Sequence, residues 1–144
     1  MEDMKITVLF LCTHNSARSQ MAEAFLNQMG SDRFEAYSAG LEPKDINPYT
    51  KRVMSEIGID ISSQYPKVLK DFMGRKHFGY LITVCTQAEE RCPSTFPGIG
   101  KRLFWDIKDP DSLVGSEEEK LSKFREIRDQ IRHKIEQWLS GQTG

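Results

Sequence analysis

The sequence predicts an α/β fold, a doubly wound sheet of four parallel strands flanked by helices. Two observations predict this class. Near-continuous apolar runs, typical of parallel strands covered on both faces, recur along the chain, and segments with helical spacing lie between them. The length of 144 residues suits one hydrophobic core, and no internal repeat, low-complexity tract or linker divides it. We therefore expect a single domain over residues 1–144.

The first half of the chain alternates strand and helix patterns. Residues 5–12 form a run of strand-forming residues, which places Cys12 at the carboxyl end of a buried strand. Apolar residues follow at helical spacing from Ser19, and Gly30 is a suitable residue to end that helix. The further elements expected in this half are a strand at 34–39 and a helix that Asn47-Pro48 opens and Gly58 ends.

The second half of the chain continues the same alternation. Residues 80–85 repeat the buried-strand pattern, and residues 102–105 are the candidate fourth strand. Ser116 and Glu119 form a capping box that opens the last helix. The inward stripe of this helix consists of Leu121, Phe124, Ile127, Ile131, Ile135 and Trp138. Both tryptophans are expected in the core.

Charge and hydropathy exclude several partners. Lys and Arg number 20 against 21 Asp and Glu, so the net charge of -1 gives no general attraction to nucleic acid or to an anionic membrane. The longest apolar run, at 6–12, is far shorter than a membrane span, and the acidic start Met1-Glu2-Asp3 is unlike a signal peptide. We expect a cytoplasmic monomer.

The segment Cys-Thr-His-Asn-Ser-Ala-Arg-Ser at 12–19 lies between a buried strand and a helix. A loop that curls into a helix N-terminus directs successive backbone N–H groups into one concavity, which binds an oxyanion. The guanidinium of Arg18 adds a bidentate donor. The same groups stabilise a thiolate, so the sequence predicts for Cys12 a pKa well below the ~8.5 of a free cysteine. The expected oxyanion-binding loop consists of Thr13, His14, Asn15, Ser16, Ala17, Arg18 and Ser19.

Two points about this loop stay open from the residues alone. Asn15 and either Ser16 or Ser19 have the side chains to brace the loop and to hydrogen-bond the thiolate. A cysteine and an arginine at this spacing also occur by chance, as a buried strand end and a surface charge. The flanking strand and helix favour the chemical interpretation.

Residues 12–23 resemble the active-site loop of the low-molecular-weight protein tyrosine phosphatase superfamily, and within it the thioredoxin-coupled arsenate reductases. Gln-Met-Ala-Glu at 20–23 is typical of the reductases, whereas the phosphatases usually carry proline after the Arg-Ser pair. His14 and Ala17 depart from the glycine and cysteine of many members. The other matching stretches are Tyr37-Ser-Ala-Gly40, Gly58-Ile-Asp-Ile-Ser62, Val84-Cys85, Cys92-Pro93 and Asp109-Pro110. The resemblance implies the strand order 2-1-3-4.

The resemblance also implies a reaction, the reduction of arsenate to arsenite. Cys12 would attack arsenic, Cys85 would attack Cys12, and Cys92 would attack Cys85, after which thioredoxin, or glutaredoxin or another thiol, reduces the disulfide. Phosphate or sulfate would compete as oxyanions. Asp109 is the candidate general acid, with Asp106 and Asp111 as nearby alternatives. Without the resemblance, Asp109-Pro110 reads as a turn.

No tightly bound cofactor is expected. Some reductases bind potassium beside the loop, through residues that match Asn15, Glu23 and Ser38, but Pro66 and Lys67 stand where a further aspartate is needed. The cysteine spacing does not suit zinc, and His14 reads as a surface residue rather than the partner of Cys12.

Two other functions fit the sequence. The first is a phosphatase that hydrolyses phosphate monoesters through a Cys12 phosphoenzyme; phosphotyrosine would need aromatic walls, and only Phe104 and Trp105 lie near Asp109. The second is a non-enzymatic redox sensor based on disulfide exchange between Cys12 and Cys85.

Overall fold

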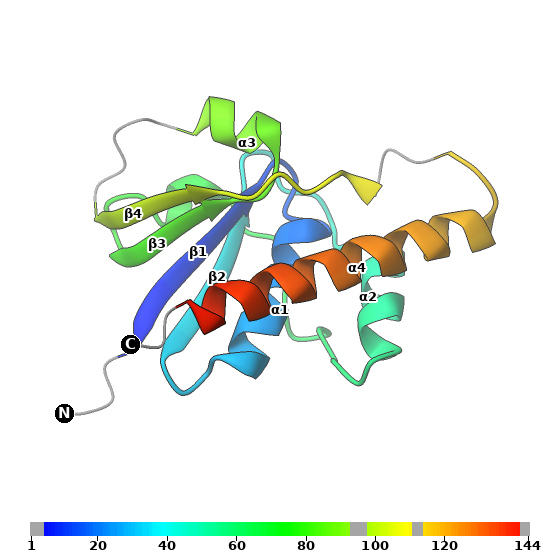
Figure 1. The fold of residues 1–144 in the computed structure, drawn as a ribbon. Coiled ribbons are helices and arrows are strands. Elements are labelled where there is room, and N and C mark those ends of the chain that lie inside the picture. The colour runs from blue at the N-terminus through cyan, green and yellow to red at the C-terminus, as the bar shows by residue number, and fades with distance from the viewer. Residues whose placement is uncertain (1–4, 93–97, 111–113, 142–144) are drawn as a thin grey trace.

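The computed structural model describes residues 5–92, 98–110 and 114–141. Within these residues the strands form one parallel sheet in the order β2-β1-β3-β4, which confirms the predicted class and strand order (Figure 1). The elements are β1 (Ile6–Cys12), α1 (Arg18–Met29), β2 (Phe34–Gly40), α2 (Pro48–Ser55), the 3-10 helix η1 (Leu69–Asp71), β3 (Phe78–Thr83), α3 (Thr86–Arg91), β4 (Ile99–Phe104) and α4 (Glu117–Ser140).

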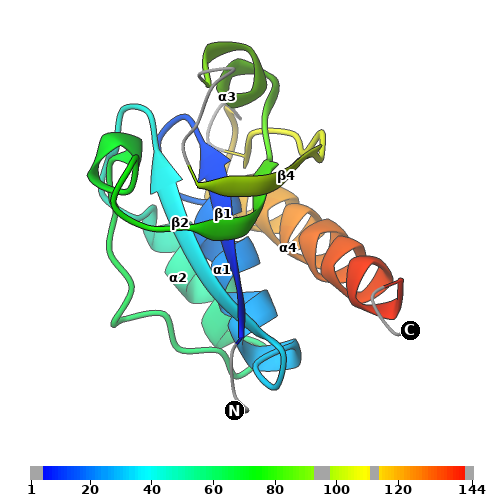
Figure 2. The same cartoon turned by 90° about the vertical axis from the view of Figure 1, so that its left-hand side faces the viewer.

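Both faces of the sheet are covered. The helices α1, α2 and α4 pack together on one face, as Figures 1 and 2 show. On β2, Phe34 contacts Trp138 of α4, so Tyr37, three residues further along, points to the opposite face. There it contacts Phe72, which directly follows η1. The helix α3 follows β3 closely and therefore lies at the carboxyl edge of the sheet.

The helices α2 and α4 begin at capping residues that the sequence contains. Asn47 caps α2 by accepting a hydrogen bond from the backbone N–H of Tyr49, and Pro48 occupies the first turn. This helix ends at Ser55, before the expected Gly58. The capping box of Ser116 and Glu119 at the start of α4 is confirmed.

The strands β3 and β4 begin earlier than the sequence predicts. The sequence places them at 80–85 and 102–105, but they span Phe78–Thr83 and Ile99–Phe104. A Cβ atom on Gly100 would lie 2.7 Å from the carbonyl oxygen of Gly79, so the two strands approach at a pair of glycines. Because glycine is a poor strand former, propensity alone omits both residues.

The hydrophobic core includes β1, α1 and the inward stripe of α4. Five of the six predicted stripe residues are fully buried, and the sixth, Trp138, is partly buried against Phe34, Tyr80 and Trp105. Trp105 is buried as well, so both tryptophans belong to the core as expected. None of the helices in the described residues is both long enough and apolar enough to cross a membrane.

Candidate active site

The loop after β1 wraps around the sulfur of Cys12. The backbone N–H of Asn15 donates to Cys12 Sγ at 3.1 Å, and the hydroxyl oxygen of Ser19 lies 2.9 Å from the same sulfur. Apart from the partly exposed His14, all residues from Cys12 to Ser19 are buried. The loop therefore presents hydrogen-bond donors to one atom, as the strand-loop-helix pattern predicts.

The structure assigns the bracing roles that the sequence leaves open. Asn15 adopts the left-handed conformation, with φ of 51°, which Asn tolerates better than most residues. Its side-chain amide donates to the Ser19 hydroxyl at 2.8 Å, so the hydroxyl proton of Ser19 can point to Cys12. Ser16 braces the loop through its backbone, because its carbonyl accepts from the N–H of Asn47.

The predicted low pKa of Cys12 is wrong in direction for this structure. Cys12 is 2% exposed, and this burial raises the pKa of its thiol. The Ser19 hydroxyl, the Arg18 guanidinium and the backbone N–H groups of Ser19 and Asn15 lower the pKa but do not offset the burial. The sequence reveals the donors but not how completely the loop excludes water.

Two residues outside the loop hold it in place, and sequence reasoning assigned neither of them a role. Gly40, at the end of β2, approaches the loop so closely that a Cβ atom there would lie 2.9 Å from both the Asn15 nitrogen and the Thr13 carbonyl oxygen. The side-chain amide of Gln20, which is completely buried, donates to the Asn15 carbonyl at 3.0 Å. Gly40 and Gln20 both lie in stretches that match the family, but the match did not indicate that they contact the loop.

Arg18 and Asp109 lie together at the mouth of the loop. Arg18 Nη1 donates to the carbonyl of Ile107 at 2.9 Å, and its Nη2 is 3.8 Å from Asp109 Oδ1. The side chain of Asp109 is 37% exposed, whereas that of Arg18 is 10% exposed. A cavity of about 250 Å³ is lined by Arg18, Cys85, Thr86, Gln87, Asp106, Ile107, Lys108 and Asp109. Asp106 and Asp109 both line this cavity, Asp109 forms the contact with Arg18, and Asp111 lies outside the described residues.

The second cysteine is adjacent to the loop. Thr13 directly follows Cys12, and its Oγ1 lies 3.4 Å from Cys85 Sγ while it donates to the Gln87 side chain at 3.0 Å. Cys85 is the N-cap of α3, and its sulfur accepts from the backbone N–H of Ala88 at 3.4 Å. The structure thus brings Cys85 to the loop that begins at Cys12.

The third cysteine is at the other end of α3. Cys92 is the C-cap of this helix and is 6% exposed. Burial raises the pKa of the Cys92 thiol, Arg102 lowers it, and the carboxylate of Glu89 raises it further. An α-helix rises 1.5 Å per residue, so Cys85 and Cys92 are separated by about 10 Å along α3. That distance is too great for a disulfide, whose Cα atoms lie within about 7 Å of each other.

Side chains around Glu89 fasten α3 to the sheet. Thr83 Oγ1 donates to Glu89 Oε1 at 2.6 Å, and Arg102 Nη2 donates to the Glu89 carbonyl at 2.9 Å. At the helix end, Arg91 forms an ion pair of 2.9 Å with Glu42. These contacts tie α3 to β3, to β4 and to Glu42.

The potassium site that the resemblance implies does not fit this chain. Asn15 Oδ1 already accepts the backbone N–H of Lys67, and Glu23 Oε1 accepts the Ser38 hydroxyl. The ammonium of Lys67 is 3.7 Å from that Glu23 oxygen. Two like unit charges about 4 Å apart repel by about 4 kcal/mol near a protein surface, so a metal cation would compete with the ammonium.

Other metal ligation is also unsupported. Within the described residues, no group of three or more His, Cys, Asp and Glu side chains is arranged to hold a metal ion. His14 is directed to the Glu42 carbonyl, with its Nδ1 at 3.0 Å, rather than to Cys12. The position of His14 therefore does not support a pair with Cys12.

Comparisons with known proteins agree with this geometry. Residues 7–143 match the family model for low molecular weight phosphotyrosine protein phosphatase. The chain is 39% identical to the arsenate reductase of Bacillus subtilis (strain 168) over 132 residues, which are 91% of this chain and 93% of that protein.

Solved structures give the same result. An arsenate reductase in the phosphate-binding state aligns with a TM-score of 0.76 and 30% identity, covering 97% of this chain and 100% of that one. A thioredoxin-dependent arsenate reductase of Corynebacterium glutamicum aligns with a TM-score of 0.71 and 29% identity, covering 98% of this chain and 63% of that one. The chain belongs to the low molecular weight phosphotyrosine protein phosphatase family.

Proposed function

We propose that this protein is a thioredoxin-dependent arsenate reductase that uses Cys12, Cys85 and Cys92 in turn. The observation that carries the proposal is the contact between Thr13 of the oxyanion loop and the sulfur of Cys85. A hydrolytic phosphatase needs no second thiol at its nucleophile, whereas a reductase does. The names of the relatives in Bacillus subtilis and Corynebacterium glutamicum support the substrate and the electron donor.

The first step is substitution at arsenic. The Cys12 thiolate forms a bond to arsenic, and one arsenate oxygen leaves as water after it receives a proton from Asp109. The loop N–H groups and Arg18 hold the remaining oxygens. Arsenic is still pentavalent at this stage, so no electrons have been transferred.

The second step is the reduction. The Cys85 thiolate attacks Cys12 Sγ, a disulfide forms, and the bond between sulfur and arsenic breaks with its electron pair remaining on arsenic. Arsenic becomes trivalent and leaves as arsenite. Two thiols have thereby supplied two electrons.

The third step regenerates the nucleophile. Cys92 attacks Cys85, which releases the Cys12 thiolate and forms a disulfide between Cys85 and Cys92. Because the intact helix holds these residues about 10 Å apart along its axis, α3 must unwind for this bond to form. The dithiol of thioredoxin then reduces the disulfide between Cys85 and Cys92.

The walls of the cavity favour arsenate over an aromatic phosphate ester. The described residues that line it include no aromatic side chain. Trp105 is instead buried against Phe10 and Trp138, so it is not available to hold a phosphotyrosine ring. The same loop would still bind phosphate or sulfate as competing oxyanions.

The organisation of the whole chain is part of the proposal. We propose that residues 1–144 form one domain, which the family match over residues 7–143 supports.

A coupled assay tests the function. We expect arsenate to drive NADPH oxidation in the presence of thioredoxin and thioredoxin reductase, and we expect Cys12→Ser, Cys85→Ser and Cys92→Ser to abolish sustained turnover. Hydrolysis of para-nitrophenyl phosphate, measured in parallel, is expected to be slow. Rapid ester hydrolysis without arsenate-dependent NADPH loss would identify a phosphatase instead, and inactivity in both assays would favour the redox sensor.

The variant Cys92→Ser separates the steps of the relay. It should release one arsenite per protein and then stop, because the disulfide between Cys12 and Cys85 has no resolving thiol. Mass spectrometry of the stopped protein under non-reducing conditions checks the disulfide. Repeated turnover by Cys92→Ser would exclude the three-cysteine relay while leaving the first two steps intact.

A further inference from the structure

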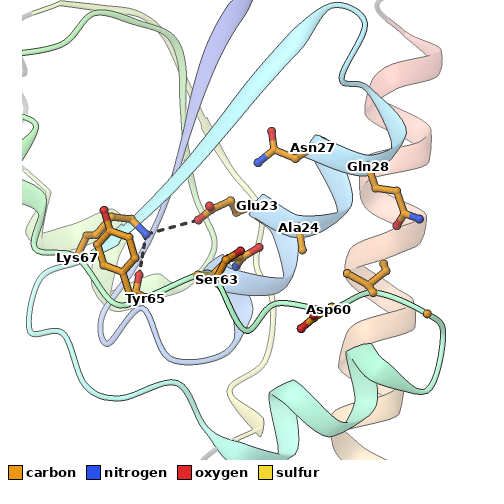
Figure 3. Close-up of a pocket in the computed structure, with 11 residues that line it drawn as sticks. Glu23, Ala24, Asn27, Gln28, Asp60, Ser63, Tyr65 and Lys67 are labelled. Carbon is orange, nitrogen blue, oxygen red and sulfur yellow. Dashed lines mark hydrogen bonds and ion pairs between the residues drawn. The ribbon is translucent and has the colours of Figure 1, made fainter.

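A largely buried ion pair between Glu23 of α1 and Lys67 lies beside the oxyanion loop. The ammonium of Lys67 is 3.7 Å from Glu23 Oε1 and donates to the carbonyl of Tyr65 at 2.7 Å, as Figure 3 shows. The side chains of Lys67 and Glu23 are 11% and 13% exposed. A carboxylate this well covered requires a compensating cation, and Lys67 is the cation that the structure places beside it.

Each member of the pair depends on the other. Burial raises the pKa of Glu23, and the Lys67 charge and the Ser38 hydroxyl oppose that rise. Burial also lowers the pKa of Lys67, which Glu23 opposes. The charged pair is therefore held together by mutual attraction in a setting that disfavours either charge alone.

The backbone of Lys67 is part of the loop's support. Its N–H donates to Asn15 Oδ1 at 2.8 Å, and its carbonyl accepts the N–H of Gly40 at 2.8 Å. The first of these bonds fixes which way the Asn15 amide faces, so that its NH₂ group donates to Ser19. Ser19 in turn contacts the Cys12 sulfur.

The side chain of Lys67 holds that backbone segment in place. Its ammonium lies 4.5 Å from the centre of the Tyr65 ring, in addition to its bond to the Tyr65 carbonyl. The same carbonyl accepts from the side-chain amide of Gln20, which also donates to the Asn15 carbonyl. The Lys67 ammonium thus contacts both Glu23 and Tyr65, and the Tyr65 carbonyl links it to Gln20, which supports the loop.

We propose that the Lys67 ammonium is a built-in monovalent cation that positions the oxyanion loop, so that this protein needs no bound potassium there. Lys67 is a positioning residue, since it acts on Cys12 only through Asn15 and Ser19. The inference rests on the geometry of the loop and holds whether the protein reduces arsenate or hydrolyses phosphate esters.

The test measures the loop without any arsenate chemistry. In a Cys85→Ser/Cys92→Ser background, iodoacetate reacts with Cys12 alone, and its rate reports the thiolate and the anion cradle together. The rate and the thermal unfolding midpoint are measured at equal ionic strength in potassium, sodium and choline chloride. We expect the protein with Lys67 intact to give the same values in all three salts.

The variant Lys67→Met removes the charge and keeps most of the side-chain volume. We expect it to slow Cys12 alkylation several-fold and to lower the unfolding midpoint, with both deficits partly relieved by potassium but not by choline. A cavity of about 480 Å³ that both Lys67 and Glu23 line gives the added ion a route to the carboxylate. Lys70→Met, at an exposed lysine of η1, is the matched control and should change neither value.

Three results would overturn the proposal. The first is a potassium-specific effect on the protein with Lys67 intact, because the Lys67 ammonium would then not be sufficient without bound potassium. The second is a Lys67→Met variant that equals Lys70→Met in both measurements. The third is a Lys67→Met deficit that potassium does not relieve, since Lys67 would then act through packing and not through its charge.

Discussion

The two strand-to-helix connections that carry the cysteines differ in how firmly they are held. Both follow neighbouring parallel strands, β1 and β3, and both end at the same edge of the sheet. The loop from Cys12 to Ser19 is buried almost throughout and is hydrogen-bonded from several sides. By contrast, Ala88 is the only residue of α3 that is fully buried. The loop after β1 is therefore held by many contacts, whereas the short helix after β3 is held by few.

The length of α3 supports this contrast. An isolated helix of six residues is not stable in water, so α3 depends on its contacts with the sheet for its existence. Those contacts are made largely by the side chain and backbone of Glu89. A segment of this kind opens locally at low cost, whereas the oxyanion loop opens only when the core around it does.

The variant Gly40→Ala should disturb the more firmly held of the two connections, the loop from Cys12 to Ser19. A methyl group there would lie 2.9 Å from two backbone atoms of the loop, so the loop must move. Overpacking of this kind costs about 1–3 kcal/mol, and we expect phosphate binding to weaken about tenfold to hundredfold. Titration calorimetry measures the affinity for phosphate. Gly141→Ala is the control, because a Cβ atom there meets only ordinary van der Waals contacts. Unchanged affinity would mean that the loop is not rigid.

The pH dependence of Cys12 alkylation tests the same loop. Because burial raises the pKa of Cys12 and the Ser19 hydroxyl lowers it, Ser19→Ala should move the profile of Cys12 alkylation to higher pH. At neutral pH we expect the rate to fall about tenfold to hundredfold, since a hydrogen bond to a charged group contributes ~1.5–3 kcal/mol. The rate of reaction with iodoacetate, measured as a function of pH, tests this shift. Ser31→Ala, at an exposed serine, is the control. A profile that does not move would remove Ser19 from thiolate stabilisation.

The variant Glu89→Gln should loosen the attachment of α3 to the sheet. Exposed ion pairs contribute ~0.2–1 kcal/mol, so we expect Cys92 to react with a thiol reagent about twofold to fivefold faster in a Cys12→Ser/Cys85→Ser background. Loss of the Glu89 charge also lowers the pKa of Cys92 toward its ordinary value, which acts in the same direction. Hydrogen exchange of the α3 amides isolates the opening itself. Exchange equal to that of the exposed Glu90→Gln would show that Glu89 does not hold the helix.

The sequence predicts local features of this molecule better than distant ones. The strand, loop and helix around Cys12, the cap at Asn47 and the capping box at Ser116 were all confirmed because each depends on residues close together in the chain. The starts of β3 and β4 were missed because they depend on a contact between Gly79 and Gly100.

The support of the loop shows the same limit. The contacts of Asn15 with Gly40 and with Lys67 join residues far apart in the chain, and no local pattern reveals them. The direction of the Cys12 pKa was wrong for a related reason. The donors can be read from seven consecutive residues, but the burial that outweighs them is made by the whole fold.

The burial of all three cysteines has a consequence for how long the protein survives intact. Cys12, Cys85 and Cys92 are 2%, 4% and 6% exposed, so all three residues are largely covered. Oxidation of a thiol beyond the sulfenic acid is essentially irreversible and would end the activity of that molecule. The proposed relay needs all three sulfurs in the reduced form, so the packing that raises the pKa of Cys12 would also limit the access of adventitious peroxide to these thiols.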